Sequence, residues 1–325
     1  MPGGTPTVVD RFGNPAGVEN LYLDGHVFMI LGGPSRNLLD QSLFALPGVL
    51  TFAVNNVAAA MLRRGFPPAF WTYGDTTWKF HDAVWKCPNT LKFSPQPKLD
   101  NPLGEKRNGE VVQVPELSPR KMPGVLGIYR NTVFDPAKFL TEETVNWGVG
   151  KAQLLGQLRP WLQENAGLQP GAGDKETEAA WKAASASGKL PRDKFRELCP
   201  YPKVLTTMFQ AIRLCYLLGF RQVYLVGCDF TMSESYRYSF EEVGNPGTVG
   251  GNNNSYEAIK VLLAIAKPHF EAAGFQLFNL NPESMLTAFP YLPFEAAVAR
   301  ACKNLPRVID TQGWYEKKDK KQTVL

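Results

Sequence analysis

Residues Val27 to Ser35 read VFMILGGPS, an apolar run that passes directly into two glycines, a proline and a serine. Five consecutive apolar residues before such a turn are typical of a buried strand, with Gly32 to Ser35 as its exit turn. Three further runs also end at polar or glycine residues: Asn55-Asn56, Gly74-Asp75-Thr76-Thr77 and Gly227-Cys228-Asp229. Because helical patterns separate these runs, the sequence predicts an α/β fold with a doubly wound, mostly parallel sheet.

Strand and helix signals alternate in both halves of the chain, while the middle differs. We expect further strands at Leu50–Val54, Ala69–Tyr73, Gln222–Val226 and Gln276–Leu280. We expect helices at Asn56–Arg64, Thr76–Trp85, Val204–Leu218 and Asn254–Ala272. Prolines and charges interrupt every pattern over residues 95–123, where we expect loops. Residues 151–198 are polar and rich in alanine, which predicts a small helical insertion or lid.

Composition favours an ordinary globular protein over a disordered or membrane-spanning one. The chain has 325 residues, of which 44% are hydrophobic and 20% charged. We find no bilayer-spanning run and no secretory signal, and the five cysteines show no C-x-x-C pair, so we expect a cytoplasmic protein with reduced thiols. The net charge of +5 lies partly in the tail and favours solubility over a nucleic-acid footprint.

The turn Gly32 to Ser35 is the first candidate binding site. Its glycines let backbone N–H groups approach a ligand, and Ser35 can cap a helix whose N-terminus favours an anion. An ordinary tight turn between strand and helix fits the same residues equally well. Asn55 and Asn56 offer amide groups at the next strand end, and a helix cap explains them at least as well.

Three titratable residues are candidates for catalysis. Asp75 follows a strand and can hold a ribose hydroxyl, a metal or a helix N-terminus. His81 is a less favoured base candidate. Asp229 precedes a tyrosine-rich stretch, Thr231 to Glu242, whose hydroxyls can donate to a leaving phosphate or simply pack on the surface. The sequence contains no zinc-ligand spacing and no D-x-D motif, so we expect a metal-independent mechanism and no cofactor.

Residues 205–240, LTTMFQAIRLCYLLGFRQVYLVGCDFTMSESYRYSF, resemble the central segment of bacterial lipooligosaccharide sialyltransferases. Three further points of similarity follow in the same order along the chain: GGPS at 32–35, AVNN at 53–56 and NLNPESML at 279–286. The matched pieces cover about half of the chain. The first half of the pattern is also similar to nucleotide-binding proteins of the motility-accessory and pterin-pyrophosphokinase-like kind.

The resemblance implies a modified Rossmann fold of the GT-A-like kind and sugar transfer from a nucleotide donor without a metal. It implies that the nucleotide and its phosphate are lined by Gly32, Asn55 and Thr207. Gly33, Pro34, Ser35 and Asn56 adjoin these positions and complete the expected donor site. Tyr238, with Tyr236 as a second candidate, would protonate or hydrogen-bond the departing phosphate.

The chain also departs from the family pattern. Gly32 replaces an asparagine, and a second asparagine of the family falls at Gly74 or Asp75 here. The family's general-base histidine should lie just before the helix expected at Asn254, where this sequence has Gly250, Gly251 and Asn252. Another group then supplies the base, the acceptor needs little deprotonation, or the reaction differs; the substitute bases are Asp75, His81, Asp229 and Glu241.

These patterns divide the chain into five segments: an N-terminal arm (1–24), the first half of a nucleotide-binding α/β domain (25–94), a loop-rich and helical insertion or lid (95–200), the second half of the domain (201–310) and a basic tail (311–325). The first hypothesis is a glycosyltransferase that moves a sugar from a nucleotide-sugar donor to a hydroxyl of a glycan, a small molecule or modified nucleic acid. Asp75 would deprotonate that hydroxyl or fix the sugar.

Two alternatives stay open. One is a Mg²⁺-dependent nucleotide pyrophosphokinase or phosphotransferase with Asp75 and Asp229 as metal ligands. The other is a non-catalytic nucleotide-binding protein. The sequence leaves open whether the chain forms a homo-oligomer.

Overall fold

The computed structural model describes residues 8–128, 136–137, 139–141, 147–191, 194, 206–233, 235, 238–240 and 248–303. The chain divides into two compact units. The smaller comprises Met1–Thr5 and Tyr129–Thr206, and the larger comprises Pro6–Ile128 and Thr207–Leu325. All candidate site residues belong to the larger unit. Tyr236, Glu241 and the tail 311–325 lie outside the described residues.

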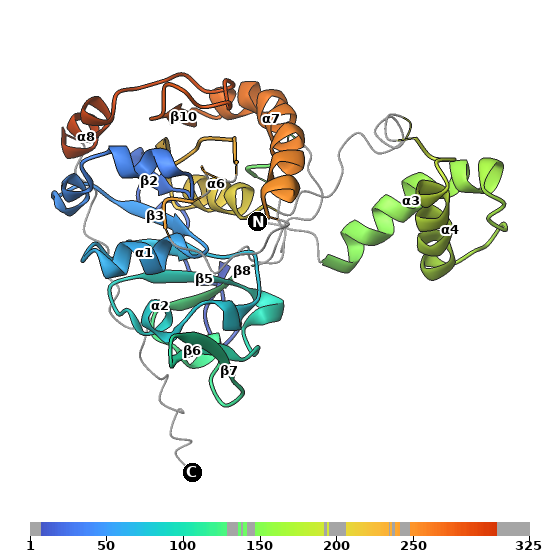
Figure 1. Cartoon of the computed structure of the whole chain (residues 1–325), viewed down its shortest axis with the longest axis horizontal. Coiled ribbons are helices and arrows are strands. Elements are labelled where there is room, and N and C mark those ends of the chain that lie inside the picture. The colour runs from blue at the N-terminus through green and yellow to red at the C-terminus, as the bar shows by residue number, and fades with distance from the viewer. Residues whose placement is uncertain are drawn as a thin grey trace, which may run out of the picture. The chain divides into compact units, whose positions relative to one another are not determined.

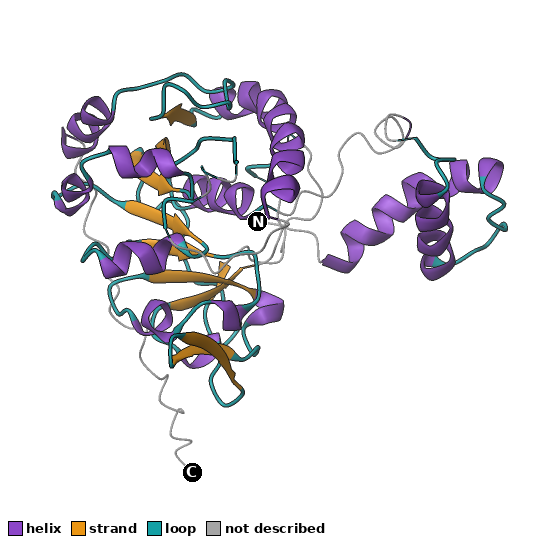
Figure 2. Cartoon of the chain, viewed as in Figure 1, coloured by secondary structure: helices purple, strands orange, loops and turns teal. Residues whose placement is uncertain are grey.

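An eight-stranded sheet forms the centre of the larger unit (Figures 1 and 2). All its neighbouring pairs are parallel except β1 with β8, which confirms the predicted α/β fold with a mostly parallel sheet. In spatial order the strands are β1 (Val8–Val9), β8 (Val125–Ile128), β5 (Leu91–Pro95), β4 (Phe70–Thr72), β3 (Thr51–Val54), β2 (Gly25–Ile30), β9 (Phe220–Val226) and β10 (Gln276–Asn279).

Helices cover both faces of this sheet. Phe28 and Ile30 share one buried cluster with residues of α1, α2 and α8, so these helices pack on the same face. Helix α6 contacts β3, β4 and β9 without contributing to that cluster, so it covers the opposite face. The α-helices of this unit are α1 (Val57–Arg63), α2 (Asp82–Lys86), α6 (Thr207–Leu217), α7 (Thr248–Ala272) and α8 (Phe294–Lys303). Short 3-10 helices lie at η1 (Pro34–Leu38), η2 (Gln41–Ala45), η3 (Thr77–Lys79), η4 (Gln96–Lys98) and η5 (Pro119–Lys121).

The direction in which successive strands are added to the sheet reverses at β2. The chain adds β3, β4, β5 and β8 on one side of β2, and then crosses to add β9 and β10 on the other. Ile30 pairs with Val226, so the carboxyl ends of β2 and β9 lie side by side. In open parallel sheets the crevice at such a reversal is the usual place for a ligand.

The expectation of loops over residues 95–123 was wrong. Strands β6 (Leu103–Arg107) and β7 (Glu110–Val114) form an antiparallel hairpin there, and β8 joins the main sheet soon afterwards. The hairpin turns at Asn108 and Gly109, which both have positive φ (52° and 91°). Asn-Gly is the sequence that a tight hairpin turn prefers. Residues 95–128 therefore belong to the sheet unit and not to the helical segment.

Two predicted helices have different bounds. The single helix expected at Thr76–Trp85 is split into η3 and α2, because Phe80 and His81 adopt extended backbone conformations. Helix α7 begins at Thr248, six residues before the expected Asn254, so Gly250, Gly251 and Asn252 lie within it.

Among the described residues of the smaller unit, the helices α3 (Trp147–Asn165) and α4 (Asp174–Ala186) pack together. Their contact includes a small buried cluster of Leu158, Leu162, Leu168, Ala184 and Leu190. The helical character expected for residues 151–198 is confirmed over the described part. Its role as a lid stays a prediction.

Gly33 tests how closely the ends of β2 and β9 approach each other. A Cβ atom at Gly33 would lie 1.9 Å from Asp229 Oδ2 and 2.5 Å from the Gly227 carbonyl oxygen. We expect Gly33→Ala to lower the free energy of unfolding by about 1–3 kcal/mol or more, because a packed backbone cannot take an extra methyl group without moving. Urea denaturation followed by circular dichroism measures this change.

The matched control is Gly156→Ala in α3, where a Cβ atom meets nothing within 4 Å. Alanine is the better helix former, so this variant should gain about 0.5–1 kcal/mol. Equal unfolding midpoints for Gly33→Ala and the wild type would contradict the close approach.

Candidate functional site

Asp229 holds the carboxyl ends of the central strands together. Its side chain follows β9 and is 3% exposed. Oδ2 accepts the backbone N–H of Ser35 at 3.2 Å, and Oδ1 accepts the side-chain amide of Asn281 at 2.5 Å. The Asp229 carbonyl oxygen also accepts the N–H of Met285 at 2.9 Å. Both carboxylate oxygens are thus engaged within the fold, and Asp229 joins three segments instead of presenting a free base.

The turn Gly32 to Ser35 is tied to β9 through its own backbone. Gly33 donates its N–H to the Gly227 carbonyl oxygen at 2.9 Å, and Ser35 donates to Asp229. Pro34 has no N–H and begins η1. The structure thus differs from the expected anion-binding turn, because the N–H groups of Gly33 and Ser35 already have acceptors. Gly32 is the member of this turn that faces a candidate catalytic side chain.

That side chain is Tyr238, whose ring covers Gly32. A Cβ atom at Gly32 would lie 2.9 Å from Tyr238 Cδ1, and Ser239 donates its N–H to the Gly32 carbonyl oxygen at 2.8 Å. Asn252 on α7 donates its side-chain amide to the Tyr238 hydroxyl at 2.8 Å. Gly32 and Asn252 therefore meet at one residue: glycine gives the ring its space, and asparagine binds its hydroxyl.

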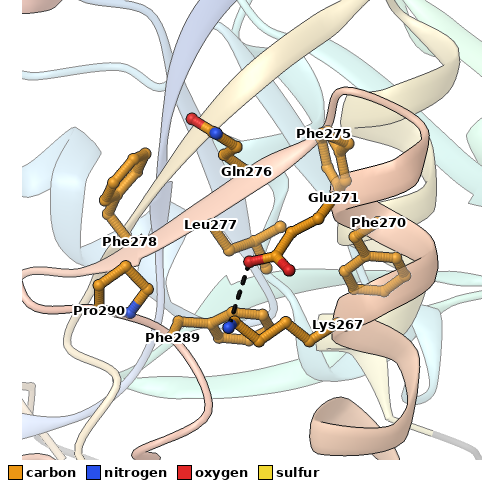
Figure 3. Close-up of a pocket in the computed structure, with 9 residues that line it drawn as sticks. All are labelled: Lys267, Phe270, Glu271, Phe275, Gln276, Leu277, Phe278, Phe289 and Pro290. Carbon is orange, nitrogen blue, oxygen red and sulfur yellow. Dashed lines mark ion pairs between the residues drawn. The ribbon is translucent and has the colours of Figure 1, made fainter.

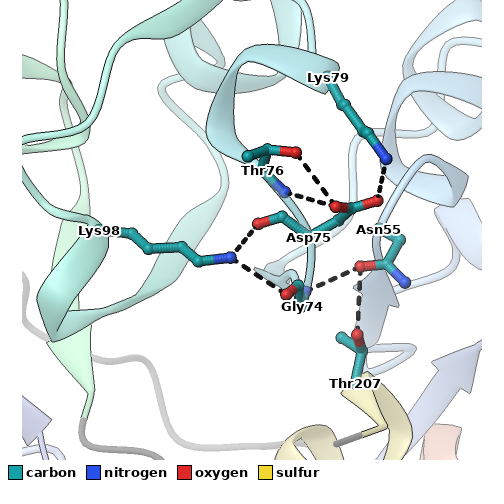
Figure 4. A network of polar contacts seen from close by, with 7 residues as sticks. All are labelled: Asn55, Gly74, Asp75, Thr76, Lys79, Lys98 and Thr207. Atoms are coloured by element: carbon teal, nitrogen blue, oxygen red, sulfur yellow. Dashed lines mark hydrogen bonds and ion pairs between the residues drawn. The ribbon is translucent and has the colours of Figure 1, made fainter.

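Asn55 connects the ends of β3 and β4 with the start of α6 (Figure 4). Its Oδ1 accepts the N–H of Gly74 at 3.0 Å and the hydroxyl of Thr207 at 3.3 Å. The Gly74 N–H can only donate, which fixes the orientation of the Asn55 amide. Asn55 has a positive φ of 49°, a conformation that asparagine tolerates better than most residues. The structure thus brings together Asn55 and Thr207, two residues expected to line one nucleotide.

Asp75 lies beside this group, exposed at the start of the loop after β4 (Figure 4). Its carboxylate accepts Lys79 Nζ at 2.7 Å and the N–H of Thr76 at 2.8 Å. Lys98 donates to the carbonyl oxygens of Gly74 and Asp75. Partial burial raises the pKa of the Asp75 carboxyl, but the hydrogen bonds from Lys79 and Thr76 outweigh it, so the pKa lies below its ordinary value. Asp75 is therefore an ionised and weakly basic carboxylate.

His81 and Asn56 both occupy helix starts. His81 precedes α2, and Asn56 precedes α1 without a side-chain capping bond. Burial lowers the pKa of His81, the charge of Asp82 opposes this, and Arg63 and Lys106 lower the pKa further. His81 is therefore a neutral imidazole at neutral pH. None of the polar contacts described above includes His81.

A separate pocket lies between the C-terminal half of α7 and the first residues of β10 (Figure 3). Lys267 and Glu271 form an ion pair of 3.1 Å on one side of it, and the remaining lining is mostly aromatic. This pocket contains none of the candidate site residues. Among the described residues, no three His, Cys, Asp or Glu side chains are grouped so that they can hold a metal ion. No described helix is both long and apolar enough to cross a bilayer.

No protein-family model matches this sequence, and no curated protein matches it either. Among solved structures, the chain is similar to the sialyltransferase CstII from Campylobacter jejuni in complex with the substrate analogue cytidine-5'-monophosphate, with 14% identity, 89% of each chain covered and a TM-score of 0.37. It is also similar to the sialyltransferase CST-II in complex with a trisaccharide acceptor and CMP, with 15% identity over 82% of this chain and 86% of that chain, and a TM-score of 0.36. Similarity at this level does not establish a shared activity.

Asn55 and its neighbour Asn56 form a natural matched pair for testing the network around β3. Asn55→Ala leaves the Gly74 N–H without its acceptor and places alanine at positive φ. We expect this variant to lose about 2–3 kcal/mol of unfolding free energy. Asn56→Ala removes a side chain that makes no capping bond and should change stability by about 0.5 kcal/mol or less. Chemical denaturation measures both, and equal losses would contradict the assigned network.

Proposed function

We propose that this chain is a glycosyltransferase that moves a sugar from a nucleotide donor to an acceptor hydroxyl, with Tyr238 assisting the departure of the nucleotide phosphate. The observation that carries the proposal is the placement of Tyr238 over Gly32, at the adjoining carboxyl ends of β2 and β9. The resemblance of residues 205–240 to sialyltransferases supports the same conclusion.

The donor site in this proposal extends along the carboxyl ends of the strands. Asn55 and Thr207 supply polar groups at the end of β3 and the start of α6, and Gly32 leaves room for the Tyr238 ring. A nucleotide that lies across these ends places its phosphate near Tyr238. Asn56 lies next to Asn55 at the edge of the same site.

Tyr238 acts as a neutral hydrogen-bond donor. An amide nitrogen can only donate, so the phenolic oxygen is the acceptor of the bond from Asn252. Accepting this bond polarises the phenol and strengthens its own O–H as a donor. Donation to a phosphate oxygen stabilises the charge that develops there as the bond to the sugar breaks.

In the reaction, a bond forms between the acceptor oxygen and the anomeric carbon while the bond from that carbon to the phosphate oxygen breaks. We assign the acceptor proton to Asp75, which is ionised at neutral pH. A carboxylate of low pKa suits a late transfer, because a hydroxyl that has already bonded to carbon is strongly acidic. We assign no metal to these steps. His81 is a less favoured base in this proposal, and Tyr236 a second phenol.

A screen of thermal stability identifies the donor. We expect one of the CMP-, UDP-, GDP- or ADP-sugars to raise the Tm, and to do so equally with EDTA present. No shift with any nucleotide would contradict the proposal and favour a protein without this activity. A shift that EDTA abolishes would favour a Mg²⁺-dependent phosphotransferase.

Tyr238→Phe tests the catalytic assignment. We expect the rate of sugar release or transfer from the identified donor to fall roughly 100-fold or more, since a single positioned proton donor contributes that much. The Kd for the donor should change little, because the ring stays in place. The control is Tyr291→Phe, which removes the hydroxyl of a half-exposed tyrosine outside the site. Unchanged turnover in Tyr238→Phe would overturn the role of this hydroxyl.

A further inference from the structure

Arg36 is a buried cation whose guanidinium has no hydrogen-bond partner among the described residues. It lies in η1, one residue after the turn Gly32 to Ser35, and its exposed fraction is 0%. Among the described residues, no group accepts a hydrogen bond from its Nε, Nη1 or Nη2 atoms. A buried guanidinium normally forms several such bonds, and leaving all of them unmade is costly. A methionine or leucine would fill this position without that cost.

The charges near Arg36 make its position still less favourable. Burial and, to a smaller extent, the positive charges of Arg64 and Arg63 together lower the pKa of Arg36 to about 10. Arg64 is held nearby by a hydrogen bond from its Nη2 to Asn37 Oδ1 at 3.1 Å. With a pKa of about 10, Arg36 keeps its charge at neutral pH. Three arginines thus raise the local positive potential beside the end of β2.

A second buried donor lies at the same turn. Ser239 is 5% exposed, and its hydroxyl has no hydrogen-bond partner among the described residues. Its backbone is fixed against this segment, because its N–H binds the Gly32 carbonyl oxygen at 2.8 Å and its carbonyl oxygen accepts the Asn37 amide at 3.1 Å. The residue with this unpaired hydroxyl is thus fixed by its backbone to residues 32 and 37, on the two sides of Arg36 in the chain.

We propose that Arg36 and Ser239 bind a phosphoryl group, with Arg63 and Arg64 adding attraction for its charge. A guanidinium and a hydroxyl are the donors that phosphate oxygens prefer, and the charge-assisted bonds would satisfy both unpaired groups. The guanidinium is closed to solvent, so the side chain or the atoms over it move when the ligand binds. The phosphoryl group belongs either to the donor nucleotide or to a separate phosphate ester. The first of these sources rests on the proposed function.

This site supplies what the preceding turn does not. The N–H groups of Gly33 and Ser35 are already bound to Gly227 and Asp229, and the carboxylate of Asp229 repels an anion. Positive charge for a phosphate at the end of β2 therefore comes from the next residue, Arg36.

The test compares Arg36→Met with the wild type by thermal unfolding in phosphate-free buffer, with inorganic phosphate, with a nucleoside monophosphate and with the matching nucleoside. Without ligand, Arg36→Met should be at least as stable as the wild type, because an unpaired buried charge is gone. Phosphate at about 100 times its Kd should raise the wild-type Tm by roughly 5 °C and leave Arg36→Met unchanged. Arg107→Met, on the exposed β6–β7 hairpin, controls for the loss of one positive charge.

The four ligands separate the two sources of phosphate and the two proposals. If the site binds the phosphate of the donor, the monophosphate raises the Tm of the wild type more than the nucleoside does. In Arg36→Met the two ligands then raise the Tm equally, because the nucleoside part still binds. If it binds a separate ester, inorganic phosphate and the nucleotide stabilise the wild type additively. If phosphate raises the Tm of the wild type and no nucleotide does, the proposed function is contradicted and the phosphoryl site is not.

Equal responses of the wild type and Arg36→Met to phosphate and to the monophosphate would overturn the phosphoryl site. Ser239→Ala keeps the proposal testable if Arg36→Met does not fold. It removes one donor and should weaken phosphate binding about tenfold. Unchanged affinity in Ser239→Ala together with unfolded Arg36→Met would assign Arg36 to the fold alone.

Discussion

The buried carboxylate of Asp229 is the interaction on which the candidate site depends. It binds the N–H of Ser35 after β2 and the amide of Asn281 after β10, and Asp229 itself follows β9. Three strand ends are thereby held in one arrangement. A buried carboxylate is costly unless its oxygens accept hydrogen bonds, and each oxygen of Asp229 accepts one. The close approach that results requires glycine at position 33 and orients the chain that leads to Arg36.

The meeting of Gly32, Tyr238 and Asn252 follows from the same arrangement. Ser239 pairs with Gly32 through the backbone, so the tyrosine before it covers the glycine. A larger residue at position 32 would displace this ring. Gly32 and Asn252 thus both fit one phenol, which has an amide as its hydrogen-bond partner.

Local patterns in the sequence were sufficient for most of the sheet and insufficient for the site. Apolar runs that end at glycine or asparagine located β2, β3, β4, β9 and β10, because parallel strands buried on both faces leave that signal. The Asn108-Gly109 turn of the β6–β7 hairpin was also visible in the sequence, but the prolines around it obscured the strands. The start of α7 was placed too late because Gly250 and Gly251 disfavour a helix. The contacts of Asp229 with Ser35 and of Asn252 with Tyr238 depend on chain packing, and no spacing in the sequence predicts them. The burial of Arg36 is equally hidden, since arginine in a polar turn indicates an exposed side chain.

Hydrogen exchange followed by mass spectrometry, with and without a saturating nucleotide, tests most directly whether the carboxyl ends of β2 and β9 form the nucleotide site. The account predicts slower exchange in residues 31–37, 55–57 and 227–240. The peptides of the β6–β7 hairpin and of the pocket between α7 and β10 should exchange at the same rate in both states. Protection confined to that pocket or to α3 and α4, or no protection anywhere, would contradict a nucleotide site at the ends of β2 and β9.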